Sequence, residues 1–379
     1  MDKGGILNPV FDNYAEPPGV FIREELEARG WTQRDLAFIL DCSEQTVTKI
    51  ISGKSGISAE MAKALAEAFG TSASLWAGLQ KEWELREARN PDPAIKARAA
   101  MQTAYPIREM ISRGWLQEGE QSVLQMQFDR FFESFGVGRP QIAAAFKKDS
   151  EEHSPEELAW LFRVRQIARD QDVPDYSAEK LCAALQQLRS MVIDADDVGR
   201  VPSILLQAGI RFVVVERLSN CKIDGVCTWL DDTTPVVGMT TRFNRLDNFW
   251  FVLIHELTHV LEGHGKGTVG IIDDLERDLG ADAIGVSDDE RIADKASLNF
   301  AFSREKLMSF YARKQPFISE RDVIGFAAVC EVHPAIVVGQ LQYLKKDYAW
   351  LRKWLVNIRA NLIEHCLVDG FGNVAKATL

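Results

Sequence analysis

The spacing of apolar residues along the chain changes twice. In residues 18–88 and 94–190, apolar positions recur every three or four residues, which is typical of amphipathic helices. Residues 210–216, 225–230 and 234–240 are instead short runs rich in valine and aromatic residues, which predict strands. Helical spacing returns at residue 247 and continues to about residue 365. We therefore predict a mainly α protein with a small antiparallel β-sheet, an α+β fold.

Two prolines mark the clearest boundary in this pattern. They lie in the segment Asn90-Pro-Asp-Pro93, where both disfavour helix. A chain of 379 residues also exceeds the size of a single hydrophobic core, so several domains are expected. We predict an N-terminal tail, an all-α domain, a helical connecting region, a second domain that contains the sheet and a C-terminal helical region, over residues 1–15, 16–90, 91–190, 191–310 and 311–379.

Two short helices near the N-terminus predict a helix-turn-helix. Thr32 and Asp35 can form a capping box at the start of the first helix, and Ser43 can cap the second. Asp41, in the turn, belongs to the few residue types that tolerate a left-handed backbone. We expect inward-facing apolar side chains at Leu36, Ala37, Ile39, Leu40, Val47, Ile50 and Ile51.

The outward positions of this pair are polar, of the types that contact DNA bases and phosphates. They are Gln33, Glu44, Gln45, Thr46, Thr48, Lys49, Ser52 and Lys54. The formal net charge of −11 argues against a chain-wide footprint for nucleic acid. Residues 1–90 hold 10 basic and 14 acidic residues, so any DNA binding must depend on a local face. A helical bundle used only for dimerisation or protein contact is the alternative.

Residues 255–259, with the sequence HELTH, predict a metal site. They lie in an apolar helix expected over residues 249–262, which Asp247 or Asn248 can cap and Gly263 can end. A spacing of four places His255 and His259 on one face, one turn apart. Zn²⁺ suits two neutral imidazoles and a carboxylate, and Glu256 beside them can act as a general base.

The third metal ligand is less evident. The downstream candidates are Glu262, Glu276, Asp278, Asp282, Glu290 and Asp294. Glu262 lies too far along the helix from His255 to close a tetrahedral site. Glu290 opens the next predicted helix, over residues 289–300. It can either complete the metal site or serve only as a capping-box partner of Ser287.

Three further residues have more than one interpretation. His264 follows the glycine break and either shapes the cleft, together with Asp294, or is a solvated loop residue. His333 precedes a proline and is a helix-start residue rather than a catalytic one. Asp247 is a helix cap rather than a member of the site.

Two family resemblances follow from these motifs. Residues 16–88, with WTQRDLA over 31–37 and SEQTVTKIISGK over 43–54, resemble the XRE-type helix-turn-helix of HigA-like antitoxins and repressors. Residues of about 200–300, with RLDNFWF over 245–251, HELTH and ERIAD over 290–294, resemble the ImmA/IrrE family of zinc metallopeptidases. The second resemblance implies a zincin-like domain in which Glu290 is the third zinc ligand. The segment ASLNFAF over 296–302 departs from the family's usual ending.

The ImmA/IrrE resemblance implies an intracellular peptidase that cuts a repressor or antitoxin partner to control transcription. We therefore expect an active or latent zinc metalloendopeptidase, with a substrate strand added to the sheet edge at residues 236–239. The alternative is a HigA-like DNA-binding regulator whose second domain senses metal or a partner without cleavage. No signal-peptide pattern opens the chain, so we expect a cytoplasmic protein without a membrane partner. A homodimer on an operator is also expected. The amphipathic stretch over 341–355 is interpreted as a helix packed on its own domain, with a contribution to dimerisation as the alternative.

Overall fold

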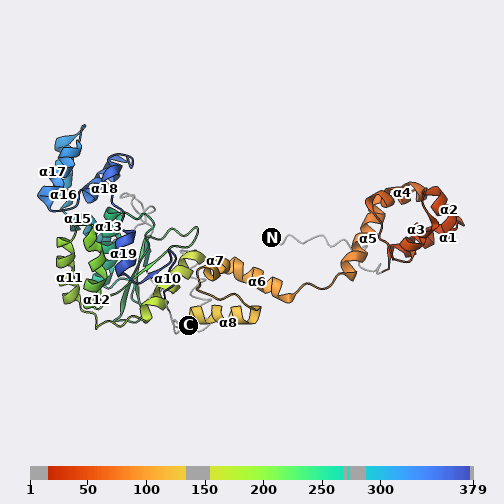
Figure 1. The fold of residues 1–379 in the computed structure, drawn as a ribbon, viewed down its shortest axis with the longest axis horizontal. Helices are drawn as coiled ribbons and strands as arrows, with labels where there is room; N and C mark the ends of the chain where they lie inside the picture. The colour runs from red at the N-terminus through yellow and green to blue at the C-terminus, as the bar shows by residue number, and fades with distance from the viewer. Residues whose placement is uncertain (1–15, 134–153, 268–270, 274–286, 376–379) are drawn as a thin grey trace. The chain divides into compact units, whose positions relative to one another are not determined.

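The chain forms two compact units, Met1–Pro93 and Ala94–Leu379. The computed structural model describes residues 16–133, 154–267, 271–273 and 287–375 (Figure 1). The boundary between the units follows the Asn90–Pro93 segment, where residues 88–92 form no helix. The predicted tail over 1–15 lies outside the described residues.

The first unit is helical, as the spacing over residues 18–88 predicts, and consists of α1 (Pro18–Arg29), α2 (Gln33–Ile39), α3 (Glu44–Ile51), α4 (Ala59–Phe69) and α5 (Ala73–Glu87). The capping box of Thr32 and Asp35 starts α2, and the Ser43 hydroxyl accepts a hydrogen bond from Thr46 N at the start of α3. Asp41 between them has a left-handed φ of 48°. The predicted turn between α2 and α3 is confirmed.

One predicted core position of this unit is wrong. Ile39 is 43% exposed, and its neighbour Phe38 is 88% exposed. The seven-residue helix α2 has a single buried face, which Leu36 and Ala37 occupy. Ile39 therefore points away from the core that Leu36 shares with Val47.

The second unit is mainly helical, as predicted. Its helices are α6 (Pro93–Ala104), α7 (Ile107–Ser112), α8 (Gln121–Glu133), α10 (Pro155–Arg169), α11 (Ala178–Ser190), η1 (Asp196–Arg200), α12 (Val201–Gln207), α13 (Leu246–Glu262), α15 (Asp288–Phe300), α16 (Arg304–Lys314), α17 (Glu320–Cys330), α18 (Pro334–Lys345), η2 (Arg352–Trp354) and α19 (Arg359–His365). In the described part of the chain, no single helix is long and apolar enough to cross a membrane; only α17 and α18 taken together, with a bend of 120° between them, meet the length and composition criteria.

A five-stranded sheet lies in the second unit, with the order β4-β2-β3-β1-β5. Its strands are β1 (Arg211–Val215), β2 (Gly225–Trp229), β3 (Pro235–Met239), β4 (Ile271–Asp273) and β5 (Val368–Asp369). The three predicted strands are present. The sheet is mixed rather than wholly antiparallel, because β1 runs parallel to β3 and β5, whereas β2 runs antiparallel to β3 and β4.

The mixed topology comes from the connection between β1 and β2. After β1, residues 216–224 carry the chain to β2, which is not the neighbour of β1 in the sheet. Strands β2 and β3 then form an antiparallel hairpin, and β3 fills the position between β2 and β1. The predicted sheet edge over 236–239 is therefore wrong, since β3 is paired on both sides. A substrate strand cannot add there.

Helices cover both faces of the sheet, which explains its continuous apolar strands. Val213 and Val215 belong to the same apolar cluster as Trp160 of α10. Phe212 and Val214 point to the opposite face and share a cluster with Leu253 of α13. The metal-site helix α13 is thus packed directly against the sheet.

The amphipathic stretch over 341–355 is not one helix. Helix α18 ends at Lys345, and Lys346 adopts a left-handed φ of 54°. The polypeptide then turns and forms only the short helix η2. Leu341 is fully buried in the core of its own unit.

Candidate metal centre

Helix α13 begins earlier than its apolar pattern predicts. It starts at Leu246, and the preceding Arg245 makes no side-chain cap. The prediction that Asp247 or Asn248 caps this helix is wrong. Asp247 lies in the first turn and forms a 2.6 Å ion pair with Arg245. The predicted end is confirmed, because Gly263 has a left-handed φ of 73°.

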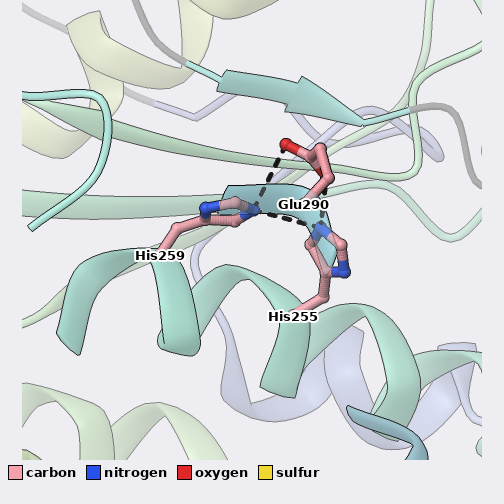
Figure 2. A group of neighbouring side chains, drawn as sticks. All are labelled: His255, His259 and Glu290. Atoms are coloured by element: carbon pink, nitrogen blue, oxygen red, sulfur yellow. Dashed lines mark hydrogen bonds and ion pairs between the residues drawn. The ribbon is translucent and has the colours of Figure 1, made fainter. Parts of the chain in front are cut away.

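Two helices bring His255, His259 and Glu290 together (Figure 2). The histidines lie one turn apart on α13, and Glu290 comes from the first turn of α15. His255 Nε2 is 3.1 Å from His259 Nε2 and 3.0 Å from Glu290 Oε2. His259 Nε2 is 3.5 Å from Glu290 Oε1. Three donor atoms of the types that zinc prefers thus point at one another.

These separations fit a shared metal ion. Ligand atoms at about 2.0–2.1 Å from a zinc ion, at tetrahedral angles, lie about 3.3 Å apart. The observed separations of 3.0, 3.1 and 3.5 Å bracket that value. Both histidines are buried, and Glu290 closes the group from the opposite helix. The donor set and its spacing therefore suit Zn²⁺.

Glu290 contacts both the start of its own helix and the two histidines. Its backbone N donates a 3.2 Å hydrogen bond to Ser287 Oγ, which caps α15. Its side chain turns away from the helix start and accepts from His255. Burial opposes ionisation of Glu290, but the hydrogen bonds and charges of His255 and His259 outweigh it and place its pKa below the usual range.

The outer nitrogens of both histidines also contact polar side chains. His255 Nδ1 lies 3.3 Å from Asp294 Oδ1. His259 Nδ1 lies 2.9 Å from His264 Nδ1, and His264 Nε2 is 3.2 Å from Asp289 Oδ1. The hydrogen bond between His259 and His264 is of the kind that fixes the orientation of metal-ligating imidazoles. His264 is thus a partner of His259 rather than a solvated loop residue.

Glu256 follows His255 on α13 and is fully buried, with its carboxylate against the first residue of β2. A Cβ atom added at Gly225, the first residue of β2, would lie 2.1 Å from Glu256 Oε1. A larger residue at this position would require the Glu256 carboxylate or Val252 to shift. Sequence reasoning missed Gly225, although a glycine inside a strand often marks such a close approach. It also missed Asp289.

Among the residues that the structure describes, no other candidate belongs to this group. Glu262 is exposed at the end of α13, and Glu276, Asp278 and Asp282 lie outside the described residues. His333 caps α18, where its Nδ1 accepts a 3.1 Å hydrogen bond from Ala335 N. Its predicted place at a helix start is confirmed.

In the first unit, α3 presents the predicted polar face. Glu44, Gln45, Thr48, Lys49 and Ser52 are exposed and Thr46 is half-buried, while Val47, Ile50 and Ile51 are buried. Lys54 is exposed just beyond the helix, and half-buried Gln33 accepts a 2.9 Å hydrogen bond from the Thr48 hydroxyl. This bond ties the start of α2 to the middle of α3.

Comparison with known proteins identifies this first unit. Residues 22–76 match the helix-turn-helix family. The chain is 32% identical over 71 residues to the uncharacterized HTH-type transcriptional regulator YddM of Escherichia coli (strain K12), a match that covers 19% of this chain and 76% of the relative. The chain belongs to the helix-turn-helix family. Helices α2 and α3 are accordingly the two helices of the motif, and α3 is its second, recognition helix.

Two further similarities also cover about a fifth of the chain. Virulence-associated protein A′ of Dichelobacter nodosus is 37% identical over 71 residues, which cover 18% of this chain and 62% of that protein. A solved addiction module antidote protein of a HigA family from Coxiella burnetii is 27% identical, with a TM-score of 0.18. That match covers 20% of this chain and 98% of the antidote protein.

Proposed function

We propose that the chain is a zinc-dependent peptidase joined to a DNA-binding helix-turn-helix, and that it cleaves a repressor or antitoxin-type protein to control transcription. The observation that carries the proposal is the group of His255, His259 and Glu290, with donor atoms within 4.8 Å of one another. Buried Glu256 beside them supplies the general base that hydrolysis needs. The resemblance to ImmA/IrrE peptidases points to the same residues.

In this proposal, His255, His259 and Glu290 hold a zinc ion. Zinc bound there supplies Lewis acidity that activates water and polarises a peptide carbonyl. Glu256 takes the proton of the attacking water and delivers it to the leaving amine as the peptide C–N bond breaks. Asp294 and His264 keep the two imidazoles in place, and Asp289 in turn supports His264.

The helix-turn-helix assigns the first unit to DNA binding. Its proposed reading face consists of Gln45, Thr46, Lys49 and neighbouring polar side chains on α3, which fit the major groove. A two-fold operator would require two copies of the motif, so we propose a homodimer on DNA. The name of the relative YddM, a transcriptional regulator, agrees with this role. A cytoplasmic location stays a prediction.

A second candidate is a regulator whose second unit senses metal without cutting. One observation favours it: the side chains of His255, Glu256 and His259 are at most 1% exposed. A peptide substrate reaches such a group only if the protein around it opens. In this alternative the metal site is a sensor, and the DNA-binding face alone carries the function.

Glu256→Gln distinguishes the two functions. The substitution keeps the size of the side chain and removes the base, while the three metal-binding residues stay intact. The full chain should be co-expressed with each repressor or antitoxin-type protein encoded in the same genome, and the intact mass of each such regulator measured. We expect one new cleavage site with the wild-type chain, an intact regulator with Glu256→Gln, and equal zinc content in both chains.

The same variant serves as a trap, since it should bind the uncut regulator without releasing products. Glu262→Gln is the matched control, because Glu262 is exposed and seven residues from His255. It should cleave as the wild type does. A Glu256→Gln chain that still cleaves would disprove the peptidase assignment. An uncut regulator with the wild-type chain, combined with specific operator binding, would favour the sensor.

A further inference from the structure

A cavity of about 570 Å³ lies in the second unit between α13, α15 and α18. Small-molecule sites in proteins have volumes of about 300–1,000 Å³. Its aromatic lining consists of Phe243, Trp250, Phe251, Phe300, Tyr343 and Tyr348. Trp250 and Phe300 stack with ring centroids 6.2 Å apart. The cavity is thus large enough for a compact organic molecule and offers it flat apolar walls.

Two polar atoms on the lining residues lack hydrogen-bond partners within the described ranges. They are the indole Nε1 of Trp250, a donor, and Oε1 of Gln340, an acceptor. The side chain of Trp250 is 98% buried, since only 2% is exposed. A buried polar group without a partner is unfavourable, and such groups are rare in native proteins. A ligand with one acceptor and one donor would satisfy both atoms.

Positive charge is in excess around the cavity. Arg245 and Asp247 line it as an ion pair and neutralise each other. Arg304 and Lys346 also line it, and in the described part of the chain neither forms an ion pair. Lys346 is exposed and Arg304 is half-buried, so these charges lie toward the opening. They would attract an anionic group on a molecule whose apolar body fills the interior.

We propose that this cavity binds a small organic anion with an aromatic or compact apolar body. The site is separate from the metal group, because none of the three metal-binding residues lines it. The two sites are neighbours, since Phe251 lines the cavity and its ring lies 6.2 Å from that of His255. The proposal does not depend on peptidase activity, and it assigns the second unit a ligand of its own.

The test uses two fluorescent probes of the same shape, the anion anilinonaphthalene sulfonate and its neutral analogue phenylnaphthylamine. Each is titrated into the metal-free full chain. We expect one saturable site, with the anion bound about tenfold more tightly than the neutral probe. Arg304→Gln combined with Lys346→Asn should abolish this preference and leave binding of the neutral probe unchanged. Asparagine suits position 346 because it tolerates the left-handed backbone there.

The charge control is Lys295→Gln combined with Lys306→Gln, two exposed positions outside the cavity. It removes the same charge and should preserve the preference. A second pair of variants, both at Ser297, tests where on the protein the probes bind. Ser297 lines the cavity, and its hydroxyl donates to Ala293 O of its own helix. Ser297→Leu should fill the cavity and block both probes, whereas Ser297→Ala should bind them as the wild type does.

Several results would overturn the proposal. One is binding of both probes with equal affinity to the wild-type chain. Another is retention of the anion preference in the Arg304→Gln, Lys346→Asn chain. A third is undiminished binding of both probes to a folded Ser297→Leu chain, since this would place the probes elsewhere on the protein. Circular dichroism of each variant establishes that it is folded before the titration.

Discussion

Glu290 shows how one residue serves two structures at once. Its backbone N is part of a helix cap with Ser287, while its carboxylate lies against His255 and His259. From the sequence alone, the two roles exclude each other, because a capping box uses both the backbone and the side chain of the glutamate. In the folded chain only the backbone half of the box forms. The side chain is thereby available for the metal site.

The first prediction at the residue scale is that the carboxylate of Asp294 supports His255 in metal binding. Its Oδ1 lies 3.3 Å from His255 Nδ1, the nitrogen that faces away from Glu290. Asp294→Asn should therefore reduce zinc affinity about 10- to 100-fold. Competition with a chromophoric chelator measures this affinity. Asp288→Asn is the control on the same helix, since Asp288 is 88% exposed, and it should leave the affinity unchanged. Equal affinities for all three chains would contradict the supporting role of Asp294.

The second prediction at the residue scale concerns the packing of Gly225 against Glu256. An added Cβ would lie 2.1 Å from Glu256 Oε1 and 2.7 Å from Val252 Cγ1. Gly225→Ala should therefore lower the free energy of unfolding of the second unit by about 1–3 kcal/mol, as overpacked substitutions do. Urea unfolding measures the change. Gly325→Ala is the control, because an exposed helix position with open space around it should gain about 1 kcal/mol. A Gly225→Ala chain as stable as the wild type would refute the close packing.

At the scale of the element, α3 combines a buried face with an exposed polar one. Val47, Ile50 and Ile51 fix it to the core of the first unit. Ser43 at its start and the hydrogen bond between Thr48 and Gln33 hold its orientation relative to α2. The exposed side chains therefore stand on a rigid support, as a recognition helix requires.

The prediction at the scale of the element is that Gln45 on α3 contacts DNA bases. It is exposed near the start of α3, where recognition helices contact base edges. Gln45→Ala should weaken binding to a duplex selected from a random-sequence pool by about 1–3 kcal/mol. Fluorescence anisotropy at fixed salt measures the affinity. Glu67→Ala on α4, also outside the core, should not weaken it. If Gln45→Ala binds the selected duplex as tightly as the wild type, α3 does not read its bases.

Elements with strong local signals could be predicted from the sequence. Capping residues located α2 and α3, Gly263 located the end of α13, and valine-rich runs located β1, β2 and β3. Strand partners could not be predicted, because pairing of β1 with β3 depends on contacts far apart in the chain. The three-residue β4 and the two-residue β5 are too short for a periodic pattern.

Some residues of the candidate site could likewise be predicted from the sequence, and others could not. The spacing of His255 and His259 is local, so the sequence located both residues and Glu256 between them. Asp289 contacts His264 only because α15 crosses α13, and Gly225 lies against Glu256 only because β2 packs on the same helix. No pattern within one segment contains such contacts. They became visible only when the elements were placed together.

At the scale of the whole molecule, the chain joins a small helical unit to a larger α+β unit through a segment rich in proline. The first unit has the exposed polar helix of the helix-turn-helix family. The second has a sheet covered on both faces, and the helix α13 on one face carries the two histidines. Our proposal joins these parts as a regulator that binds DNA and cuts a protein.

The zinc content of the full chain tests this account most directly. It should be measured by elemental analysis after exhaustive dialysis, for the wild type and for Glu290→Ala with Glu262→Ala as the exposed control. We predict about one zinc per wild-type chain, the same for Glu262→Ala, and little or none for Glu290→Ala, because loss of a ligand weakens the site strongly. A wild-type chain that purifies without zinc and does not bind it when it is added would contradict the proposal. Equal zinc content in Glu290→Ala would contradict the assignment of Glu290.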